Sequence, residues 1–528
     1  MPDRAGEGTR HNLLLPKRKN MSKQKNAMPI TREENFAEWY QEVIKASDLA
    51  EHAVVRGCMI IKPWGYALWE NIQSVLDKWI KETGHDNVYF PLLIPLSFMQ
   101  KEAEHVEGFA KECAVVTHYR LEGDKDGNLI PAPDAKLAEP YIIRPTSETI
   151  IGDAMASWIH SYKDLPIKIN QWANIMRWEM RTRLFLRTSE FLWQEGHTAH
   201  STAEEAQTEA LTMLDVYERL VVEYLAVPVI KGEKTPGERF PGAVDTYCIE
   251  AMMQDGKALQ AGTSHFLGQN FSHAHNMVFT DKDQKEQHAW TTSWGVSTRL
   301  IGALILTHSD DDGLVLPPRV APAHITLIPM IMNDADAEKI LAYCDALAAD
   351  LQKTTYFGAS IKVHVDKKDD RGGVKFWRAV KKGVPLRVEI GLRDIDADSL
   401  PVYRRDKPSK EKTIMTRAEL LSNASTLLDD IHHVMYQRAL DLRKAKTVEI
   451  NSLAELEKYF QQDENSTSGW AIGHFDIASE DKSEVANKLK ALKLTIRCIV
   501  KDQKDNTEKP CVFSGKQVST RVIFARAY

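Results

Sequence analysis

The sequence predicts three folded parts: an α+β domain with a central antiparallel sheet, a smaller α/β domain, and a small α+β module at the C-terminus. Between residues 141 and 310, β-like stretches are interleaved with one long helical stretch after Ser201, which indicates the first part. The prolines of "LPPRVAPAH" (316–324) then reset the pattern, and strands alternate with helices. The more polar segment from 445 to 528 forms the third part. We place the boundaries at 31–315, 316–440 and 441–528, after a basic tail over residues 1–30 that we expect to be disordered.

The first domain is expected to open with two helices. Thr31 and Glu34 have the spacing of a capping box, and Trp39 and Val43 follow at helical spacing. A second helix runs through Leu68, Ile72, Leu76 and Trp79 and stops at Gly84. The stretch "NVYFPLLIP" (87–95) is β-rich, and its Pro91 belongs at a sheet edge or an interface.

The α/β domain follows from a regular alternation of apolar strands and helices. The expected elements are a strand at 325–332, a helix at 334–353, a strand at 361–365, a helix at 371–382 and the strand "VPLRVEIG" at 384–391. Parallel strands joined by helices account for this order.

Chain length, apolar runs, cysteine spacing and net charge limit the classes of protein to which the chain can belong. The chain of 528 residues is too long for one core, and no apolar run approaches the roughly 20 residues that a membrane span requires. The 6 cysteines form no C-x-x-C pair, which favours a reducing compartment, so we expect a cytoplasmic protein. A formal net charge of −6 argues against wholesale coating of nucleic acid and still permits a local basic binding face.

The segment "RWEMRTRLFLRTSEFLWQEGHTAH" (177–200) combines arginines, carboxylates and aromatic rings. Alternation from Ala173 to Met180 predicts one strand, "RTRLFLRTSE" (181–190) a loop, and Phe191, Trp193 and Glu195 a returning strand. Guanidinium groups match phosphate oxygens, rings stack on bases, and carboxylates receive amines or hydrated Mg²⁺. The hairpin therefore fits a nucleoside triphosphate site without a glycine loop. A solvated charged hairpin with a few buried rings is the alternative.

Two other patterns, one with P-loop spacing and one with clustered histidines, indicate neither a P-loop nor a metal site. Gly232 and Gly237 have the spacing of a P-loop, but Glu238 stands where the phosphate-binding lysine is required. His265, His273 and His275 have no local cysteine or carboxylate that would complete a metal site.

The hairpin resembles motif 2 of the class II aminoacyl-tRNA synthetases. "TTSWGVSTRLIGALI" (291–305) resembles their motif 3, and "VYFPLL" (88–93) resembles motif 1, the dimer-interface motif. The resemblance extends to one subfamily, the prolyl-tRNA synthetases of the archaeal and eukaryotic-like type, over residues 31 to 528. The segments that carry it are "RPTSET" (144–149), "RTSEFLWQEGHTAH" (187–200), "QAGTSHFLGQNFS" (260–272) and "GVPLRVEIGLRDI" (383–395).

The resemblance implies a class II catalytic fold and a reaction in two steps. L-proline and ATP, with Mg²⁺, give prolyl-adenylate, and the prolyl group then passes to the 3′ end of tRNA(Pro). It also implies a homodimer. The roughly one hundred residues between motifs 2 and 3 leave no room for an inserted editing domain. The alternative is a catalytically inactive, synthetase-like protein that binds RNA or regulates.

The resemblance also implies roles for individual residues. Arg177, Glu179 and Arg299 carry catalysis, with Arg177 between the proline carboxylate and the α-phosphate. The ATP-binding residues implied are Arg177, Glu179, Arg187, Phe191, Gln260, Thr263, Ser297 and Arg299. The proline-binding residues implied are Thr146, Glu148, Arg177, Trp193 and His265. Ser297 stands where the family commonly has threonine, and the hydroxyl is kept.

The remaining roles lie in the last two parts of the chain. The α/β domain resembles the family's anticodon-binding domain, with Glu389 and Arg393 expected to read base edges and Leu392 in place of a usual proline. A basic stretch suits phosphates, although a solvated helix face explains it equally; its members are Lys367, Lys368, Arg371, Lys375, Lys381 and Lys382. The family's third domain often holds zinc on four cysteines. Here only Cys498 and Cys511 lie there, with His474 the nearest further candidate, so we expect no structural zinc. The carboxylate of Tyr528 is expected to fold back toward the active site.

Overall fold

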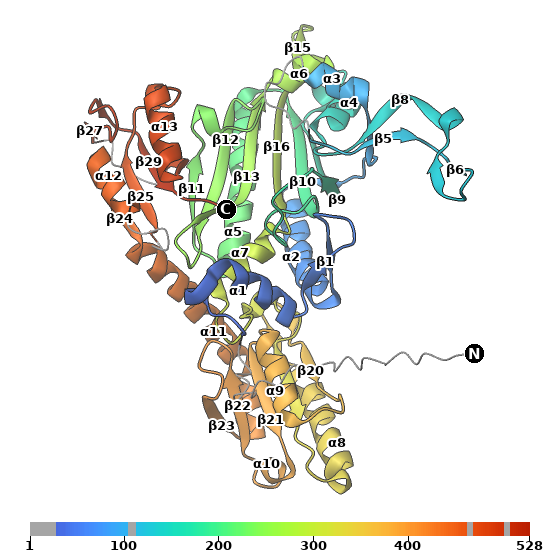
Figure 1. Cartoon of the computed structure of the whole chain (residues 1–528), viewed down its shortest axis with the longest axis vertical. Coiled ribbons are helices and arrows are strands. Elements are labelled where there is room, and N and C mark those ends of the chain that lie inside the picture. Colours follow the sequence, from blue (N-terminus) through green and yellow to red (C-terminus); the bar gives the residue numbers. More distant parts are fainter. Residues whose placement is uncertain (1–27, 104–111, 462–467, 501–506) are drawn as a thin grey trace, which may run out of the picture.

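An 11-stranded sheet forms the centre of the upper half of the molecule in Figure 1. The computed structural model describes residues 28–103, 112–461, 468–500 and 507–528. From edge to edge the strands are β24 (Thr447–Glu449), β25 (Trp470–His474), β29 (Arg521–Ala525), β26 (Thr495–Val500), β11 (Val229–Glu233), β12 (Asp245–Met252), β13 (Ala258–Gly268), β16 (Trp290–Ser297), β10 (Glu190–His200), β9 (Ile167–Met176) and β3 (Asp86–Asn87). The centre, from β11 to β9, is antiparallel throughout, as predicted.

Helices share one apolar core with this sheet. They are α1 (Arg32–Ala46), α2 (Pro63–Glu82), α5 (Ala203–Glu223) and α7 (Arg299–His308). The Tyr217 hydroxyl of α5 lies 2.6 Å from the side-chain amide of Gln194 on β10. Because side chains alternate across a strand, Trp193 and Glu195 on either side of Gln194 face away from α5. That face is left for a pocket.

The N-terminal elements form largely as predicted. The Thr31 and Glu34 capping box is present on α1, and α2 ends before Gly84, whose φ of +86° is left-handed. The stretch 88–92 is not a strand: only β3 and β4 (Leu93–Pro95) flank it, a correction to the β-rich reading.

The predicted tail is partly outside the described residues, which exclude 1–27. Its last part is ordered, contrary to expectation: the Met28 side chain is buried, and its backbone N–H donates to the Asp311 carbonyl at 2.9 Å. Ordered structure therefore reaches at least three residues further upstream than the boundary predicted.

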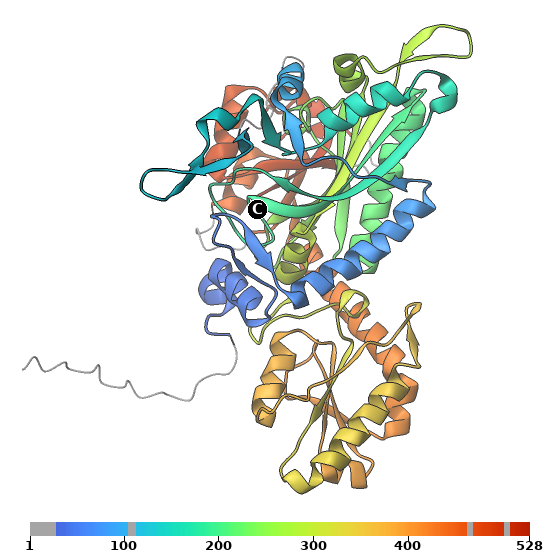
Figure 2. The same ribbon diagram turned by 90° about the vertical axis from the view of Figure 1, so that its right-hand side faces the viewer.

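The α/β domain lies below the large sheet in Figures 1 and 2. Its sheet has the order β20 (Val363–Val365), β17 (Ile325–Pro329), β21 (Leu386–Ile390), β22 (Leu400–Arg404) and β23 (Lys412–Met415). Strands β20, β17 and β21 are parallel, as the alternation predicted. The helices are α8 (Asp334–Leu351), α9 (Gly372–Lys381), α10 (Leu392–Asp396) and the long α11 (Arg417–Ala445).

Helix α11 leads from this domain back to the large sheet (Figure 1). The C-terminal module that follows adds β24, β25, β29 and β26 to that sheet, with α12 (Leu453–Phe460) and α13 (Ser483–Leu492) packed beside them. Strand β26 pairs antiparallel with β11 through Gly232↔Val500 and Glu233↔Ile499. The module thus shares one continuous sheet with the first domain.

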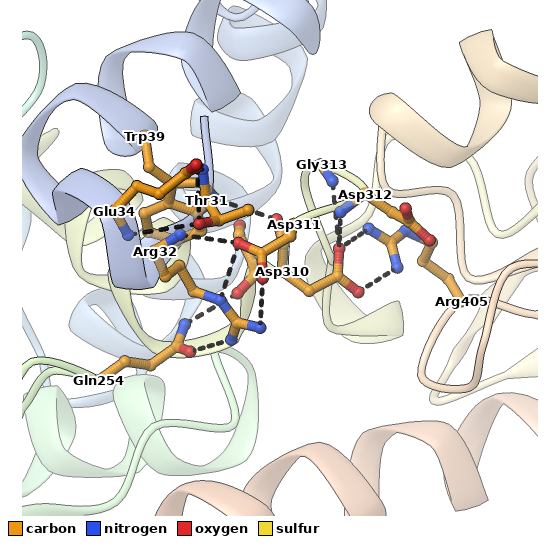
Figure 3. Close-up of polar contacts among 11 residues, drawn as sticks. Thr31, Arg32, Glu34, Trp39, Gln254, Asp310, Asp311, Asp312, Gly313 and Arg405 are labelled. Atoms are coloured by element: carbon orange, nitrogen blue, oxygen red, sulfur yellow. Dashed lines mark hydrogen bonds and ion pairs between the residues drawn. The ribbon is translucent and has the colours of Figure 1, made fainter. Parts of the chain in front are cut away.

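A short acidic loop after α7 joins three parts of the chain (Figure 3). Asp310 accepts two hydrogen bonds from the Arg405 guanidinium of the α/β domain, at 2.5 and 2.6 Å. The next residue, Asp311, binds Arg32 of α1, whose guanidinium also donates to Gln254 at 2.6 Å. The loop therefore holds both α1 and the α/β domain next to the C-terminal end of α7.

A β-arm projects from the side of the first domain (Figure 1). It consists of β4, β8 (Lys136–Ile143) and β5 (Val115–His118), continued by the hairpin of β6 (Leu121–Gly123) and β7 (Leu129–Pro131). Among the described residues, none of the helices combines the length and apolar character needed to cross a bilayer.

Candidate active site

A pocket with a cavity volume of about 270 Å³ opens on the face of the sheet opposite α5. It is built by β10, β16, β13 and β12, whose antiparallel register sets Trp193 opposite Ser297 and His265 opposite Ser293. The residues that line it, among those predicted, are Thr146, Glu148, Arg177, Phe191, Trp193, Gln260, Thr263, His265, Ser297 and Arg299. Segments more than one hundred residues apart therefore meet in one cavity.

Two arginines reach into this cavity from different elements. Arg177 follows β9, donates from Nε to the Pro145 carbonyl at 2.8 Å, and lies over the Trp193 and Phe191 rings at 5.6 and 5.8 Å. Arg299 begins α7 and donates from Nε to the Leu186 carbonyl at 3.2 Å. Burial, with Arg187 and Arg177 nearby, lowers the pKa of Arg299 to about 10, so it stays cationic at neutral pH. Desolvation also lowers the pKa of Arg177, although the cavity leaves it open to solvent and Glu148 and Glu195 oppose the shift. The guanidinium fork of each remains free to meet an anion.

Two buried carboxylates lie close to Arg177 in the same part of the structure. Glu148 is the first residue of α4 (Glu148–Trp158), is buried, and accepts a hydrogen bond from the Thr146 hydroxyl. Glu195 accepts from Ser147 at 2.6 Å and from Gln171 at 2.8 Å. A buried acidic pair beside Arg177 suits a small ligand that carries both an amine and a carboxylate.

Glu195 and His197 form a buried ion pair, with Oε2 and Nε2 3.0 Å apart. Burial works against charge on both groups, yet their mutual contact wins: the pKa of Glu195 is lowered and that of His197 is raised. His265 differs, because burial lowers its pKa to about 3 and leaves a neutral ring that contacts Thr246 at 3.1 Å.

Two residues predicted to bind nucleotide lie beside the cavity and do not line it. Glu179 and Arg187 pair with each other across 3.3 Å, and the Arg187 side chain is 54% exposed. The predicted strand through Met180 is wrong, since β9 ends at Met176. The Arg177 backbone N–H still donates to the Ser189 carbonyl at 2.7 Å, but the Glu179 N–H donates to the Ser189 hydroxyl at 3.3 Å, and the ladder stops.

Sequence reasoning missed a further set of lining residues. Five of them come from the segment between β11 and β12 and from the start of β12: Lys234, Glu238, Arg239, Phe240 and Thr246. The signal was present in "KTPGERFPG" (234–242), where a charged run lies between prolines and glycines. Glu238 excludes a P-loop there, but the pairing of β11 with β12 places the segment at the cavity all the same.

The two residues predicted to read the anticodon lie in the α/β domain. Glu389 accepts from Arg387 at 3.2 Å and from the Tyr403 hydroxyl at 3.3 Å, while Arg393 is exposed on α10. The Arg387 guanidinium lies between the rings of Phe376 and Tyr403, at 4.0 and 4.2 Å. Of the basic stretch, Lys375 is only 4% exposed, so it does not offer its charge to a phosphate.

In the C-terminal module Cys498 lies in a core with Cys248, and Cys511 lies in a separate one. Over residues 28–103, 112–461, 468–500 and 507–528, no group of three or more His, Cys, Asp and Glu side chains could hold a metal. Tyr528 donates its hydroxyl to Asp255 at 2.8 Å, and the Arg183 guanidinium of the motif 2 loop lies 6.0 Å from its ring. The chain therefore ends next to that loop (Figure 1).

Two family models match the chain: the class II tRNA synthetase core domain (G, H, P, S and T) over residues 132–308, and the anticodon-binding domain over 324–426. The proline–tRNA ligase of Bdellovibrio bacteriovorus is 56% identical over 95% of this chain and 99% of its own length. That of Rhodopirellula baltica is 55% identical over 96% and 98%. A crystal structure of the Cryptosporidium parvum prolyl-tRNA synthetase, complexed with halofuginone and AMPPNP, has a TM-score of 0.85 and 35% identity, covering 95% of this chain and 100% of that one. The chain belongs to the class II prolyl-tRNA synthetases.

Proposed function

We propose that the pocket binds L-proline and ATP side by side and forms prolyl-adenylate. The observation that carries this assignment is the arrangement of charge: one cavity is lined by Arg177 and Arg299 and by the pair of Thr146 and Glu148, which lies beside Arg177. The arginines suit the phosphates of a nucleoside triphosphate, and the carboxylate suits a cationic secondary amine. Trp193 and His265 form the apolar wall for the pyrrolidine ring between them.

The first step needs no enzyme nucleophile. A carboxylate oxygen of proline attacks the α-phosphorus, the new O–P bond forms, and the bond to the leaving pyrophosphate breaks. Arg177 reaches both the carboxylate and the α-phosphate, and Arg299 and Arg187 meet the outer phosphates. Positioning and charge neutralisation therefore supply the catalysis, which is how enzymes usually accelerate phosphoryl chemistry.

The nucleotide is held by groups from three elements. Phe191 of β10 stacks on adenine, Gln260 and Thr263 of β13 and Ser297 of β16 border it, and Glu179 contacts it from the rim. Mg²⁺ enters with ATP as part of the substrate, because Mg²⁺ commonly binds through substrate phosphates with few protein carboxylates. Glu179 is the carboxylate assigned to this end.

In the second step the 3′-hydroxyl of tRNA(Pro) attacks the prolyl carbonyl and AMP leaves. Glu389 and Arg393 read anticodon bases in the α/β domain. The Glu389–Arg387–Tyr403 contacts support this role, since they hold a carboxylate and aromatic faces at one surface, which suits unstacked bases.

We assign the chain to the archaeal and eukaryotic-like type, without editing in cis. Between β10 and β16 the chain forms only α5, β11, β12, β13, α6 (Asn270–His275), β14 (Val278–Thr280), β15 (Glu286–His288) and one short 3₁₀ turn. No insertion interrupts these elements. The C-terminal module and the similarity to the Cryptosporidium protein support the same type.

A homodimer is supported by exposed apolar side chains along the β-arm and the segment before it. Tyr89, Tyr119, Leu121 and Leu129 are between 58% and 75% exposed. Exposed apolar groups gathered on one projecting feature are typical of an interaction surface. The domain boundaries at 315 and 440 and the cytoplasmic location stay predictions.

We further propose that the C-terminal module folds without zinc, because its cores are filled by apolar side chains around Cys498 and Cys511. Metal analysis of the purified protein is expected to find less than stoichiometric zinc. Stoichiometric zinc that is lost together with the module's thermal transition on chelation would contradict this.

Proline-dependent exchange of pyrophosphate into ATP tests the proposed reaction. The account predicts exchange with proline and none without an amino acid. An inactive RNA-binding relative would show no exchange with proline, while still binding tRNA. That alternative is not favoured by identities of 51–56% to proline–tRNA ligases.

A further inference from the structure

Residues of the C-terminal module, distant in sequence, hold the pocket segment Lys234–Phe240 in place through direct contacts. Lys234, Glu238, Arg239 and Phe240 of this segment line the cavity. The backbone here forms only a 3₁₀ turn, over Pro236–Glu238, so few hydrogen bonds of its own hold it. Contacts with neighbouring residues must therefore hold the segment in position.

The first fastening is a buried cluster of charges. Glu250 of β12 is fully buried and accepts two hydrogen bonds from Arg497 Nη2, at 3.0 and 3.1 Å, and one from Lys234 Nζ at 2.9 Å. Lys234 Nζ also donates to the Arg497 carbonyl at 2.6 Å. Arg497 belongs to β26 of the C-terminal module. Lys234 therefore contacts this module directly through the Arg497 carbonyl, and indirectly through Glu250, which also binds the Arg497 guanidinium.

The second fastening is Glu480, which lies before α13 in the same module. One carboxylate oxygen accepts the Thr235 hydroxyl, and the other accepts the Gly237 backbone N–H at 3.0 Å. Neither Glu480 nor Thr235 lines the cavity. Because a hydrogen bond to a charged group is stronger than one between neutral groups, this pair of contacts fixes the turn that carries Glu238 and Arg239.

We propose that the C-terminal module is a positioning element of the active site: through Glu480 and Arg497 it holds the segment Lys234–Phe240 in the conformation that binds proline. Phe240 connects the conformation of this segment to the residues assigned to proline, because its ring lies 4.6 Å from His265 and its backbone N–H donates to Thr246 at 3.0 Å. The inference rests on the binding of proline in this pocket, as proposed above.

Steady-state exchange kinetics of Glu480→Ala in the full-length protein test the inference. Losing both contacts is expected to raise KM for proline about tenfold. This change corresponds to the typical free energy of a hydrogen bond to a charged group. KM for ATP and the melting temperature should be unchanged, since Glu480 is half-exposed and does not line the cavity that Phe191 and Arg299 line. Glu480→Gln, which keeps one acceptor, should give a smaller rise.

Glu457→Ala is the matched control. Glu457 is a half-buried glutamate of the same module whose carboxylate pairs with Lys488 at 2.8 Å, away from the segment, and its loss should leave both KM values unchanged. Thr235→Val removes the hydroxyl from the other side. In a double-mutant cycle, Thr235→Val with Glu480→Ala should be less than additive in KM for proline.

An unchanged KM for proline in Glu480→Ala would overturn the proposal. So would equal rises in KM for proline and ATP that follow a fall in melting temperature, because that pattern reports general destabilisation. Full additivity in the cycle would count against the contact as the cause. Absence of proline-dependent exchange in the wild-type protein would instead reject the proposed function, and the two failures are thereby separated.

Discussion

Replacing Glu148 by glutamine should weaken proline binding specifically. The substitution keeps the shape of the side chain and its contact with the Thr146 hydroxyl, and removes only the charge. Glu148 is buried at the start of α4, so water can do little to replace it. Arg177 keeps a second carboxylate neighbour in Glu195, which limits any disturbance at the phosphate end.

The magnitude follows from the loss of one ionic hydrogen bond to the proline amine. Such bonds contribute about 2–3 kcal/mol in protein interiors. Since each 1.4 kcal/mol corresponds to about a factor of ten, KM for proline should rise by about 30- to 150-fold. KM for ATP should stay near that of the wild type, because no part of ATP contacts Glu148 in the proposed arrangement.

Pyrophosphate exchange at varied proline and at varied ATP measures both quantities. Glu190→Gln provides the control: Glu190 is the first residue of β10, is exposed, does not line the cavity, and accepts a hydrogen bond from the Asn174 side-chain amide at 2.8 Å. A wild-type KM for proline in Glu148→Gln would refute the assignment of this carboxylate to the amine. An equal rise in KM for ATP would show that the substitution damages the whole pocket.

Three further predictions address the phosphate end, the tRNA and the pH dependence. Arg177→Ala should lower the rate of exchange by at least about a hundredfold, because the donor to both carboxylate and α-phosphate is lost; a near-normal rate would contradict its central role. Arg393→Ala should weaken tRNA charging and leave exchange intact, since Arg393 lies on α10 outside the pocket; equal loss of both activities would argue against this division. Burial lowers the pKa of His308 to about 4, so the unfolded chain binds a proton that the folded chain does not, and stability falls as pH drops below the usual histidine value of about 6.5. In His308→Gln the free energy of unfolding should therefore depend less on pH between 6 and 5, by about 1 kcal/mol per pH unit, in denaturant titrations. An exposed control, His52→Gln, should keep the wild-type slope, and an unchanged slope in His308→Gln would contradict the argument.

Much of the fold could be predicted because local signals agree with it. The capping box at Thr31 and Glu34, the acidic first turn of α5 and the alternation of strands and helices after 324 each depend on neighbours in sequence. The returning strand of the hairpin was predicted through Phe191 and Trp193, where the structure has β10. Local periodicity specifies such elements without knowledge of their partners.

What could not be predicted depends on long-range pairing. Strand β9 ends four residues earlier than alternation indicated, because the Glu179 backbone N–H donates to the Ser189 hydroxyl instead of to the backbone of the facing strand. The C-terminal module gives no sign in its own sequence that β26 pairs with β11. For the same reason Lys234 and Arg497, separated by more than 250 residues, were not recognised as neighbours.

A structure of the protein with a non-hydrolysable prolyl-adenylate analogue is the decisive test of the proposed site. We expect the pyrrolidine nitrogen within hydrogen-bond distance of Glu148 and Thr146, the phosphate at Arg177, and adenine stacked on Phe191. An analogue bound elsewhere, or bound here with its phosphate away from Arg177 and its amine away from Glu148, would contradict it.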